Sequence, residues 1–249
     1  MRAFGLIGYP LSHSFSKRYF TEKFEKEQID DCNYELFPLV EIDHIEPLIA
    51  ENESLCGLNV TIPYKVSVLP FLKEIDPAAM QIGAVNCISI RRENGEIELK
   101  GYNTDAYGFE ESLKPFLQEH HQRALIFGDG GAAKAVKYTF RKLGIPFLVV
   151  VRKPSAGAIL YSDITEGILQ NHTVLVNTTP LGTSPNTEEC PDIPYHFLSD
   201  KHIAYDLVYN PEVSLFLKNA LARGAAIKNG MEMLYLQAER SWYIWNHLL

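Results

Sequence analysis

The sequence has little that could cross-link the chain or hold a metal ion. Its 249 residues include only four cysteines, and no two of them have the Cys-x-x-Cys spacing of zinc or redox sites. No histidine stands near them to complete a zinc-binding set. The scattered residues are Cys32, Cys56, Cys87 and Cys190. We therefore expect reduced thiols, no bound metal and a cytoplasmic location.

Long hydrophobic runs and basic runs are also missing. No stretch approaches the roughly 18 apolar residues that span a membrane, and the apolar start is broken at Gly8 and Pro10, too early for a secretion signal. Lys and Arg number 23 against 31 Asp and Glu, a net charge of −8, and no run of cations could follow a phosphate backbone. We expect neither a membrane nor a nucleic acid as a partner.

The chain does contain enough apolar residues for a large core. Hydrophobic residues make up 46% of the sequence and charged residues 22%, and the length corresponds to about 1.7 typical domains. Short strand-like runs alternate with longer amphipathic ones. This alternation predicts α/β layering.

The first part of the chain predicts a mixed sheet. A strand-like run at 84–91 meets the turn sequence Glu93-Asn94-Gly95, and the run at 96–102 can return beside it as a hairpin. We place this domain at 1–103 and expect the helical segment 229–249 to complete it. The other predicted elements are strands at 3–7, 34–37 and 58–62 and helices at 17–27 and 42–50.

Residues 104–228 predict a Rossmann-like domain. A predicted helix at 108–119 is followed by a series of strand-like runs, with room for a helix between most of them. This rhythm is typical of a doubly wound parallel sheet. The runs lie at 124–127, 147–151, 173–176, 203–208 and 225–228.

A glycine-rich loop follows the first of these strands. Gly128 allows a tight turn, Gly130 lets a pyrophosphate approach the backbone, and the next helix offers its unpaired N–H groups. Ala133 takes the third motif position in place of glycine. The pattern predicts a dinucleotide site, with a glycine-rich turn of an ordinary α/β protein as the alternative.

Arg152 distinguishes between cofactors. It stands 24 residues after Gly128, at the end of the next strand, where NAD enzymes carry an acidic residue. A guanidinium can bind a 2′-phosphate in a bidentate manner, which favours NADP and argues against a methyltransferase. A solvated arginine at a strand end is the alternative.

Polar clusters stand where strands of the first domain should end. Ser14 and Ser16 precede a predicted helix and can cap it or bind a carboxylate at its positive end. His13, among them, is interpreted as structural. Lys65 and Asp105 can form a proton relay, an ammonium beside a carboxylate. The 40 residues between them leave their pairing open, and Asp105 can equally cap the helix that follows it.

Together these motifs resemble the shikimate dehydrogenase family. Eight segments match in the family's order over nearly the whole chain, which is far more specific than any one of them. The segments are GYPLSHSFS, NVTIPYK, GAVN, GYNTD, GDGGAAKA, NTTPLGT, YDLVYNP and NGMEMLYLQA.

The resemblance implies roles for the polar residues. Ser14 and Ser16 would hold a substrate carboxylate, and Lys65 would be the acid and base of the reaction, with Asp105 as its partner. Further substrate contacts are implied for Thr61, Asn86, Asp105, Gln237 and Tyr209. Cofactor contacts are implied for Gly128, Asp129, Gly130, Gly131, Ala132, Arg152, Leu207 and Gly230.

The implied activity is the reversible, NADPH-dependent reduction of 3-dehydroshikimate to shikimate in aromatic amino-acid (chorismate) biosynthesis, with hydride transfer at C3. The implied partners are this small-molecule substrate and NADP(H), in a monomer or a homodimer. Two alternatives stay open. The chain can be a quinate/shikimate dehydrogenase that uses NAD, because one ring hydroxyl is a small difference for a polar site, or a catalytically silent NADP-binding regulatory homologue.

Departures from the family pattern bear on these alternatives. Asp129 stands in the glycine loop where a small residue is usual, and its carboxylate should repel a pyrophosphate unless it points into solvent. Glu232 replaces a usual glycine. Val151 and Lys153, on either side of Arg152, differ from the residues that are usual in the family, so only the arginine matches there. The segment 154–173 is short for the family.

Overall fold

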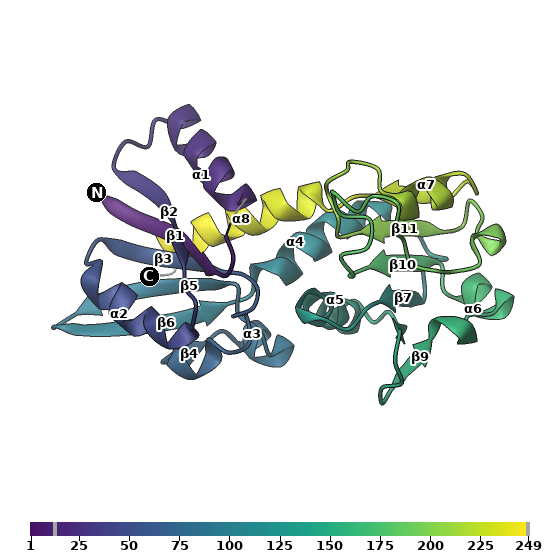
Figure 1. Ribbon diagram of the computed structural model, residues 1–249, viewed down its shortest axis with the longest axis horizontal. Coiled ribbons are helices and arrows are strands. Elements are labelled where there is room, and N and C mark those ends of the chain that lie inside the picture. The colour runs from purple at the N-terminus through teal and green to yellow at the C-terminus, as the bar shows by residue number, and fades with distance from the viewer. Residues whose placement is uncertain (12–13, 248–249) are drawn as a thin grey trace. The chain divides into compact units, whose positions relative to one another are not determined.

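The chain folds into two compact units. The computed structural model describes residues 1–11 and 14–247, so the structural interpretation of His13 lies outside the described residues. The first unit comprises Met1–Tyr107 and Gln237–Leu249, and the second comprises Gly108–Leu236. The boundaries fall within helices α4 (Thr104–Leu113) and α8 (Met231–His247) (Figure 1). The predicted boundaries, drawn from motifs, stand four and eight residues earlier.

A mixed sheet forms the centre of the first unit. Its strands in the described chain are β1 (Arg2–Gly8), β2 (Cys32–Pro38), β3 (Leu55–Val60), β4 (Glu74–Ile75), β5 (Cys87–Glu93) and β6 (Glu96–Tyr102). They lie in the order β2-β1-β3-β5-β6-β4. β1 is parallel to β2 and β3, whereas β5 is antiparallel to β3 and β6. The predicted mixed sheet is confirmed.

The predicted hairpin joins β5 and β6. Glu93 pairs with Glu96, so that Asn94 and Gly95 alone form the turn. Both turn residues have positive φ, 53° and 83°, as a two-residue turn that matches the strand twist requires. Asn and Gly tolerate this conformation better than other residues, which explains why the turn is readable from sequence.

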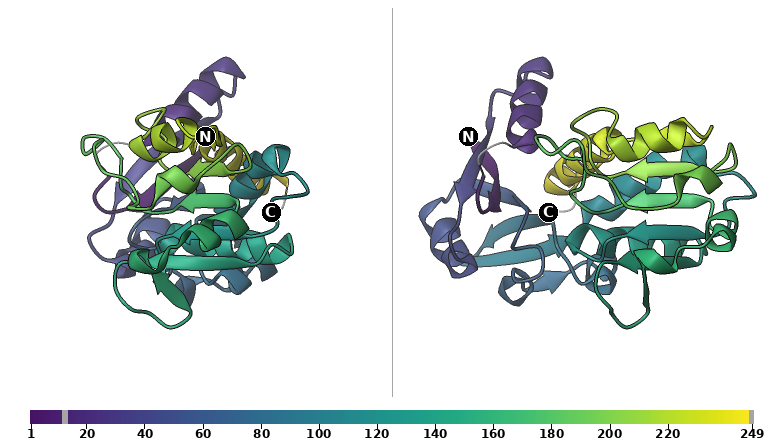
Figure 2. Two further views of the ribbon diagram at one scale, coloured as in Figure 1. Left: turned by 90° about the vertical axis from the view of Figure 1, so that its right-hand side faces the viewer. Right: turned by 45° about the vertical axis from the view of Figure 1, so that its right-hand side comes forward.

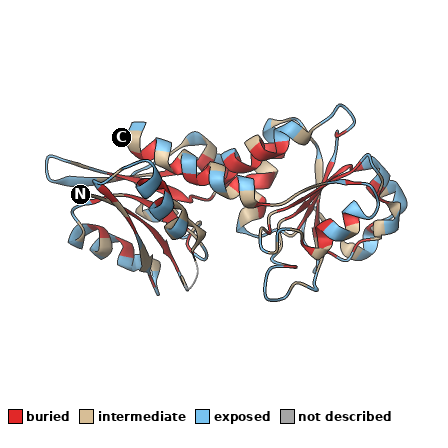
Figure 3. Cartoon of the chain, turned by 90° about the horizontal axis from the view of Figure 1, so that it is seen from above, coloured by how far each residue is buried: buried red, intermediate tan, exposed pale blue. Residues whose placement is uncertain are grey.

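Both faces of this sheet are buried. Helix α1 (Phe15–Lys26) and α8 cover one face, where Trp245 stacks on Phe4 with ring centroids 4.8 Å apart. Helices α2 (Ile45–Glu51) and α3 (Pro77–Ile82) pack their apolar residues against the other face. The strands are accordingly mostly buried, and their loops carry the exposed residues (Figure 3).

A parallel sheet forms the centre of the second unit. In the described chain its strands are β7 (Ala124–Phe127), β8 (Phe147–Val151), β9 (Ala158–Leu160), β10 (Val174–Asn177), β11 (Ile203–Asp206) and β12 (Ala226–Lys228). Their order is β12-β11-β10-β7-β8-β9, and every neighbouring pair is parallel. This confirms the predicted Rossmann-like fold class.

Helices cover both faces of the parallel sheet (Figure 2). Helix α5 (Gly131–Lys142) and residues of α4 pack on one face, and α6 (Glu166–Asn171) and α7 (Leu215–Leu221) on the other. All strands run the same way, so the loops after β7, β8 and β10 meet at the carboxyl edge of the sheet. Ligands of such folds bind at this edge.

Three predicted features differ from the structure. Helix α4 begins at Thr104 and ends at Leu113, earlier than the predicted 108–119, because Asn103 caps it and Pro115 follows it. Ser16 lies inside α1 instead of before it. The strand predicted at 84–91 begins later, at Cys87, and ends at Glu93. No helix of the described chain is both long and apolar enough to cross a membrane.

Candidate active site and cofactor site

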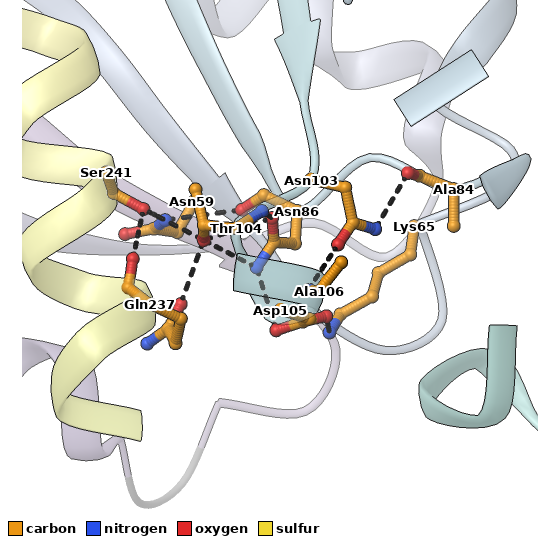
Figure 4. A network of polar contacts seen from close by, with 10 residues as sticks. All are labelled: Asn59, Lys65, Ala84, Asn86, Asn103, Thr104, Asp105, Ala106, Gln237 and Ser241. Atoms are coloured by element: carbon orange, nitrogen blue, oxygen red, sulfur yellow. Dashed lines mark hydrogen bonds and ion pairs between the residues drawn. The ribbon is translucent and has the colours of Figure 1, made fainter. Parts of the chain in front are cut away.

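Lys65 and Asp105 form an ion pair in the first unit. Lys65 Nζ lies 2.6 Å from Asp105 Oδ2, and the two side chains are 20% and 12% exposed. Partial burial strengthens the attraction and leaves the ammonium within reach of a ligand. The structure thus brings together two residues whose pairing the sequence leaves open (Figure 4).

The backbone holds this pair in place from both sides. The carbonyl oxygen of Lys65 accepts the N–H of Val85 at 2.8 Å. Asp105 stands in the first turn of α4, where the partial positive charge of the helix favours a carboxylate. The cap of that helix is Asn103, which also donates to the carbonyl oxygen of Ala84 at 2.9 Å. Because Asn103 takes the cap, the Asp105 carboxylate is available to bind Lys65.

Asn86 orients the Asp105 carboxylate. Asn86 Oδ1 accepts the backbone N–H of Thr104 at 2.6 Å, which turns its amide nitrogen toward Asp105. That nitrogen donates to Asp105 Oδ1 at 2.8 Å and to Thr104 Oγ1 at 3.0 Å. One carboxylate oxygen thus meets Asn86 and the other meets Lys65. Asn86 is buried, so these bonds define its orientation.

A buried polar network continues from Thr104 into α8. Thr104 and Ser241 are fully buried, and their Oγ atoms lie 3.3 Å apart. Asn59 Nδ2 donates to Ser241 Oγ at 3.0 Å, and Thr104 Oγ1 donates to Gln237 Oε1 at 3.4 Å. In Figure 4, Gln237 and Ser241 reach from α8 toward Thr104. The network joins the Gln237 side chain to the residues around Asp105.

The two predicted serines lie at the start of α1. Ser14 is the N-cap, and its Oγ accepts the N–H of Lys17 at 3.2 Å. Ser16 forms a hydrogen bond with the buried phenol of Tyr34, which donates to Asn59 Oδ1 at 2.8 Å. Burial raises the pKa of Tyr34 well above its usual value and outweighs the opposing bond with Ser16. The phenol therefore stays neutral and links Ser16 to the same network.

Thr61 lies directly after β3, beside the end of β1. Its N–H donates to the carbonyl oxygen of Ile7 at 2.9 Å. Its methyl group would stand 2.4 Å from a Cβ atom added at Gly8. Glycine at position 8 therefore permits the close approach of Thr61, and the ends of these two strands present the serine and lysine segments together.

The second unit contains a cavity of about 290 Å³ at the carboxyl edge of its sheet. The glycine loop, the end of β8 and the segment after β10 form its walls. The lining residues are Gly128, Asp129, Gly130, Val150, Val151, Arg152, Tyr161, Thr178, Thr179, Pro180 and Leu181.

The glycine loop fits a phosphate group. Gly128 has a φ of 96°, and a Cβ there would lie 2.8 Å from Thr179 Cγ2, so glycine is required. A Cβ at Gly130 or Gly131 would meet nothing within 4 Å, which shows open space above both residues. Gly130 is the N-cap of α5, and Ala132 lies in its first turn. The first N–H groups of the helix therefore face a region that an anion can enter.

Arg152 is exposed at the end of β8, next to Tyr161. Burial raises the pKa of Tyr161 to about 12, and the positive charge of Arg152 opposes that rise. Tyr161 is therefore a neutral hydrogen-bonding group beside a fixed cation. This pairing suits a phosphate monoester.

Both acidic departures from the family pattern have lysine partners. Lys137 Nζ lies 2.5 Å from Asp129 Oδ1. Lys228 bonds to Glu232, one turn along the chain. The negative charge that the sequence places at positions 129 and 232 is thus compensated within the second unit.

Leu207 and Gly230 are in backbone contact. A Cβ at Gly230 would lie 2.2 Å from the carbonyl oxygen of Leu207, so no other residue fits there without movement. Tyr209 lies two residues after Leu207 and also belongs to the second unit. The structure therefore assigns Tyr209 to a different unit from the other predicted substrate residues.

Asp206 holds the start of the segment 207–211. It is fully buried and accepts hydrogen bonds from Asn177 Nδ2 at 2.9 Å, from the N–H of Val208 at 3.0 Å and from the Ser214 hydroxyl. Burial raises the pKa of Asp206 to about 6, and these three bonds oppose the rise. Such bonding is typical of a structural carboxylate. Across 1–11 and 14–247, no group of three or more His, Cys, Asp or Glu side chains could hold a metal ion.

Comparison with known proteins identifies the family. Residues 6–88 match the model of the shikimate dehydrogenase substrate binding domain. The shikimate dehydrogenase (NADP(+)) of Desulforamulus reducens is 34% identical over 264 residues, which cover 97% of this chain and 88% of that protein. The chain belongs to the shikimate dehydrogenase family.

Two further relatives support this assignment. The shikimate dehydrogenase (NADP(+)) of Chlorobium phaeobacteroides is 39% identical over 241 residues, 85% of this chain and 80% of that protein. The crystal structure of shikimate 5-dehydrogenase from Thermus thermophilus, in complex with NADP(H) and shikimate, matches with a TM-score of 0.85 at 29% identity. That match covers all of this chain and 95% of the other.

Sequence reasoning missed several residues of these two sites. Asn59 and Thr104 stand inside the family motifs NVT and NTD, so their position in the sequence indicates that they lie near the site. Ser241 follows Gln237 by four residues, one helical turn, which places both on the same side of α8. Tyr161 and Lys137 are outside the motifs and have no comparable signal.

Proposed function

We propose that this chain is an NADP-dependent shikimate dehydrogenase. It reduces 3-dehydroshikimate to shikimate with NADPH, reversibly, in aromatic amino-acid biosynthesis. The observation that carries the proposal is the Lys65–Asp105 pair, held by Asn86 within a buried network on a chain of this family. The relatives named shikimate dehydrogenase (NADP(+)) support the same reaction and cofactor.

The first unit binds the substrate in this proposal. Ser14 and Ser16 take its carboxylate at the start of α1, where the helix end favours negative charge. The match of 6–88 to the substrate binding domain supports this assignment. The ring hydroxyls are bound by Thr61, Asn86, Asp105 and Gln237, and Tyr209 contributes from the second unit.

Lys65 transfers the proton. During reduction, its ammonium donates a proton to the carbonyl oxygen at C3, and during oxidation the neutral amine takes the proton from the C3 hydroxyl. Asp105 lies 2.6 Å from Lys65 and stabilises the ammonium. Asn86 and Thr104 keep the carboxylate from rotating away, so the lysine meets the substrate in one orientation.

The second unit holds NADP(H) in this proposal. The cofactor supplies the hydride when bound, and the chain supplies its binding site. The open loop at Gly130 and Gly131 takes the pyrophosphate, and Arg152 binds the 2′-phosphate. Leu207 and Gly230 border the nicotinamide. We further propose a cytoplasmic protein, as a monomer or homodimer, with the substrate domain at 1–103 plus 229–249 and the NADP domain at 104–228.

A four-way assay tests the proposal. Purified protein is mixed with shikimate or quinate and with NADP⁺ or NAD⁺, and cofactor reduction is followed by absorbance. We expect rapid reduction with shikimate and NADP⁺ only. Comparable rates with quinate and NAD⁺ would instead indicate a quinate/shikimate dehydrogenase. Binding of NADP⁺ without turnover of either acid would indicate a regulatory homologue.

A further inference from the structure

Asp129 brings a negative charge to the glycine loop. It lines the cavity of the second unit, and its side chain is 39% exposed. The proposed function places the negatively charged pyrophosphate of NADP(H) at this loop. Repulsion between the pyrophosphate and the Asp129 carboxylate would weaken cofactor binding. The Asp129 carboxylate therefore needs a cation close beside it.

Lys137 is that cation. It lies on α5, whose first residues form the glycine loop, and its Nζ is 2.5 Å from Asp129 Oδ1. The Lys137 side chain is only 20% exposed, so this pair is less screened by water than a surface ion pair. Of the two residues, Asp129 lines the cavity.

We propose that Lys137 is a positioning residue for the dinucleotide. It neutralises Asp129 and holds the carboxylate, so that the backbone N–H groups at the start of α5 can receive the pyrophosphate. Lys137 acts through Asp129 and does not itself contact the phosphates. This role rests on the proposed function, and it requires the two residues to be energetically coupled.

A double-mutant cycle tests the coupling. NADP⁺ affinity is measured by isothermal titration calorimetry at low ionic strength for the wild type, Lys137→Met, Asp129→Asn and the double variant. Methionine keeps the length of lysine and removes its charge. We expect Lys137→Met to weaken binding about tenfold or more. The double variant, neutral at both positions, should bind NADP⁺ within about threefold of the wild type, and Asp129→Asn should bind at least as tightly as the wild type.

Two controls separate this effect from general damage. Adenosine 2′-monophosphate carries the 2′-phosphate and no pyrophosphate, so Lys137→Met should leave its affinity unchanged. Lys142→Met makes the same charge change in the same helix at a lysine that pairs with Glu110. We expect this variant to bind NADP⁺ like the wild type.

Three results would overturn the proposal. If Lys137→Met weakens NADP⁺ binding equally in the Asp129→Asn background, Lys137 acts on the phosphates directly. If Lys137→Met binds NADP⁺ as the wild type does, the pair has no part in binding. If the wild type itself binds no NADP⁺, the cofactor assignment in the proposed function fails with it.

Discussion

Lys65 is the residue on which the proposed chemistry depends. Its ammonium can donate a proton to the substrate only when it is charged and correctly placed, and a neighbouring carboxylate can hold it in that state and position. Asp105, 2.6 Å away, does this, and its second oxygen is bound by Asn86. The substrate carboxylate is assigned to other residues, so proton transfer and binding are separable.

We expect Lys65→Ala to lower kcat for shikimate oxidation by about 10²–10⁴, with KM for shikimate little changed. Steady-state rates with NADP⁺ measure both constants. Lys73→Ala is the matched control, because Lys73 is an exposed lysine of the same unit that pairs with Glu98. A Lys65→Ala variant with nearly normal kcat would remove Lys65 from the mechanism.

We expect Arg152→Ala to weaken NADP(H) binding by about 1–3 kcal/mol and to leave NAD(H) binding unchanged, because only NADP(H) has a 2′-phosphate. Calorimetric titration of both cofactors checks this. Arg141→Ala serves as the control. Arg141 lies in the last turn of α5, over the Phe147 ring, and does not line the cavity. Equal losses for both cofactors would count against a 2′-phosphate contact.

Helix α8 is fitted to the first sheet through Trp245. The indole Nε1 donates to the carbonyl oxygen of Ile88 at 2.9 Å, and its ring packs directly on the backbone at Gly57. A Cβ at Gly57 would stand 2.3 Å from Nε1. Since Gln237 and Ser241 belong to the same helix, the fit of Trp245 also places part of the candidate site.

We expect Gly57→Ala to lower the free energy of unfolding of the first unit by about 1–3 kcal/mol, because the indole must move. Both tryptophans, Trp242 and Trp245, lie on α8 in this unit, so urea unfolding followed by tryptophan fluorescence reports on it. An unchanged midpoint for Gly57→Ala would contradict the predicted clash.

Arg92 closes the carboxyl end of α2. Its guanidinium donates to the carbonyl oxygens of Ile49, Asn52 and Leu55, at 2.5–3.1 Å. Ile49 lies in the last turn of α2 and Asn52 is its C-cap, where a cation is favourable, whereas Leu55 begins β3. Arg92 therefore also joins the end of the helix to the neighbouring strand.

We expect Arg92→Met to reduce the free energy of unfolding by about 1–3 kcal/mol, because it removes the three hydrogen bonds that the guanidinium donates. The fluorescence-detected urea transition measures the change. The neighbouring Arg91→Met is a close control, since Arg91 forms an exposed ion pair with Glu93 and should change stability by less than about 0.5 kcal/mol. Equal effects of the two variants would refute the capping role.

The stability of the whole molecule should depend on pH through Asp206. Its folded pKa of about 6 lies above the unfolded value of about 3.9. Between these values the native carboxyl keeps a proton that the unfolded chain has lost. The stabilisation is therefore complete below about pH 4 and is lost as the pH rises through about 6, a change of about 3 kcal/mol.

We expect Asp206→Asn to remove this dependence, since the amide keeps the shape and does not titrate. Urea unfolding at pH 4 and pH 7, followed by circular dichroism, gives the free energies for both proteins. Relative to the wild type, Asp206→Asn should gain stability at pH 7 compared with pH 4. The same pH slope in both proteins would show that another group is responsible.

Much of the fold was readable from local sequence. The strands at 124–127 and 147–151 match β7 and β8 residue for residue, because short apolar runs between turn residues have few other solutions. The Asn94-Gly95 turn and the glycine loop depend on backbone conformations that neighbouring residues determine. Helix α4 was misplaced because Asn103, and not Asp105, takes the cap.

The candidate site was only partly readable. The motifs point to Lys65, Asp105 and Asn86 as site residues. Which of these residues contact one another is decided by the fold. Asn59 bonds to Ser241 across 182 residues of sequence, and no local pattern can encode that distance. Tyr161 comes from a segment that sequence suggested was trimmed.

The sequence by itself determined the order of most strands, the two turns that need glycine or asparagine, and membership of a family through its motifs. These features depend on residues close along the chain. The sequence did not predict β4, α3 or β9. Tertiary structure alone decided that Lys65 meets Asp105, that α8 supplies Ser241 to the buried network, and that Lys137 compensates Asp129. Such contacts follow from strand order and helix packing, which bring distant residues within bonding distance only after the core has formed.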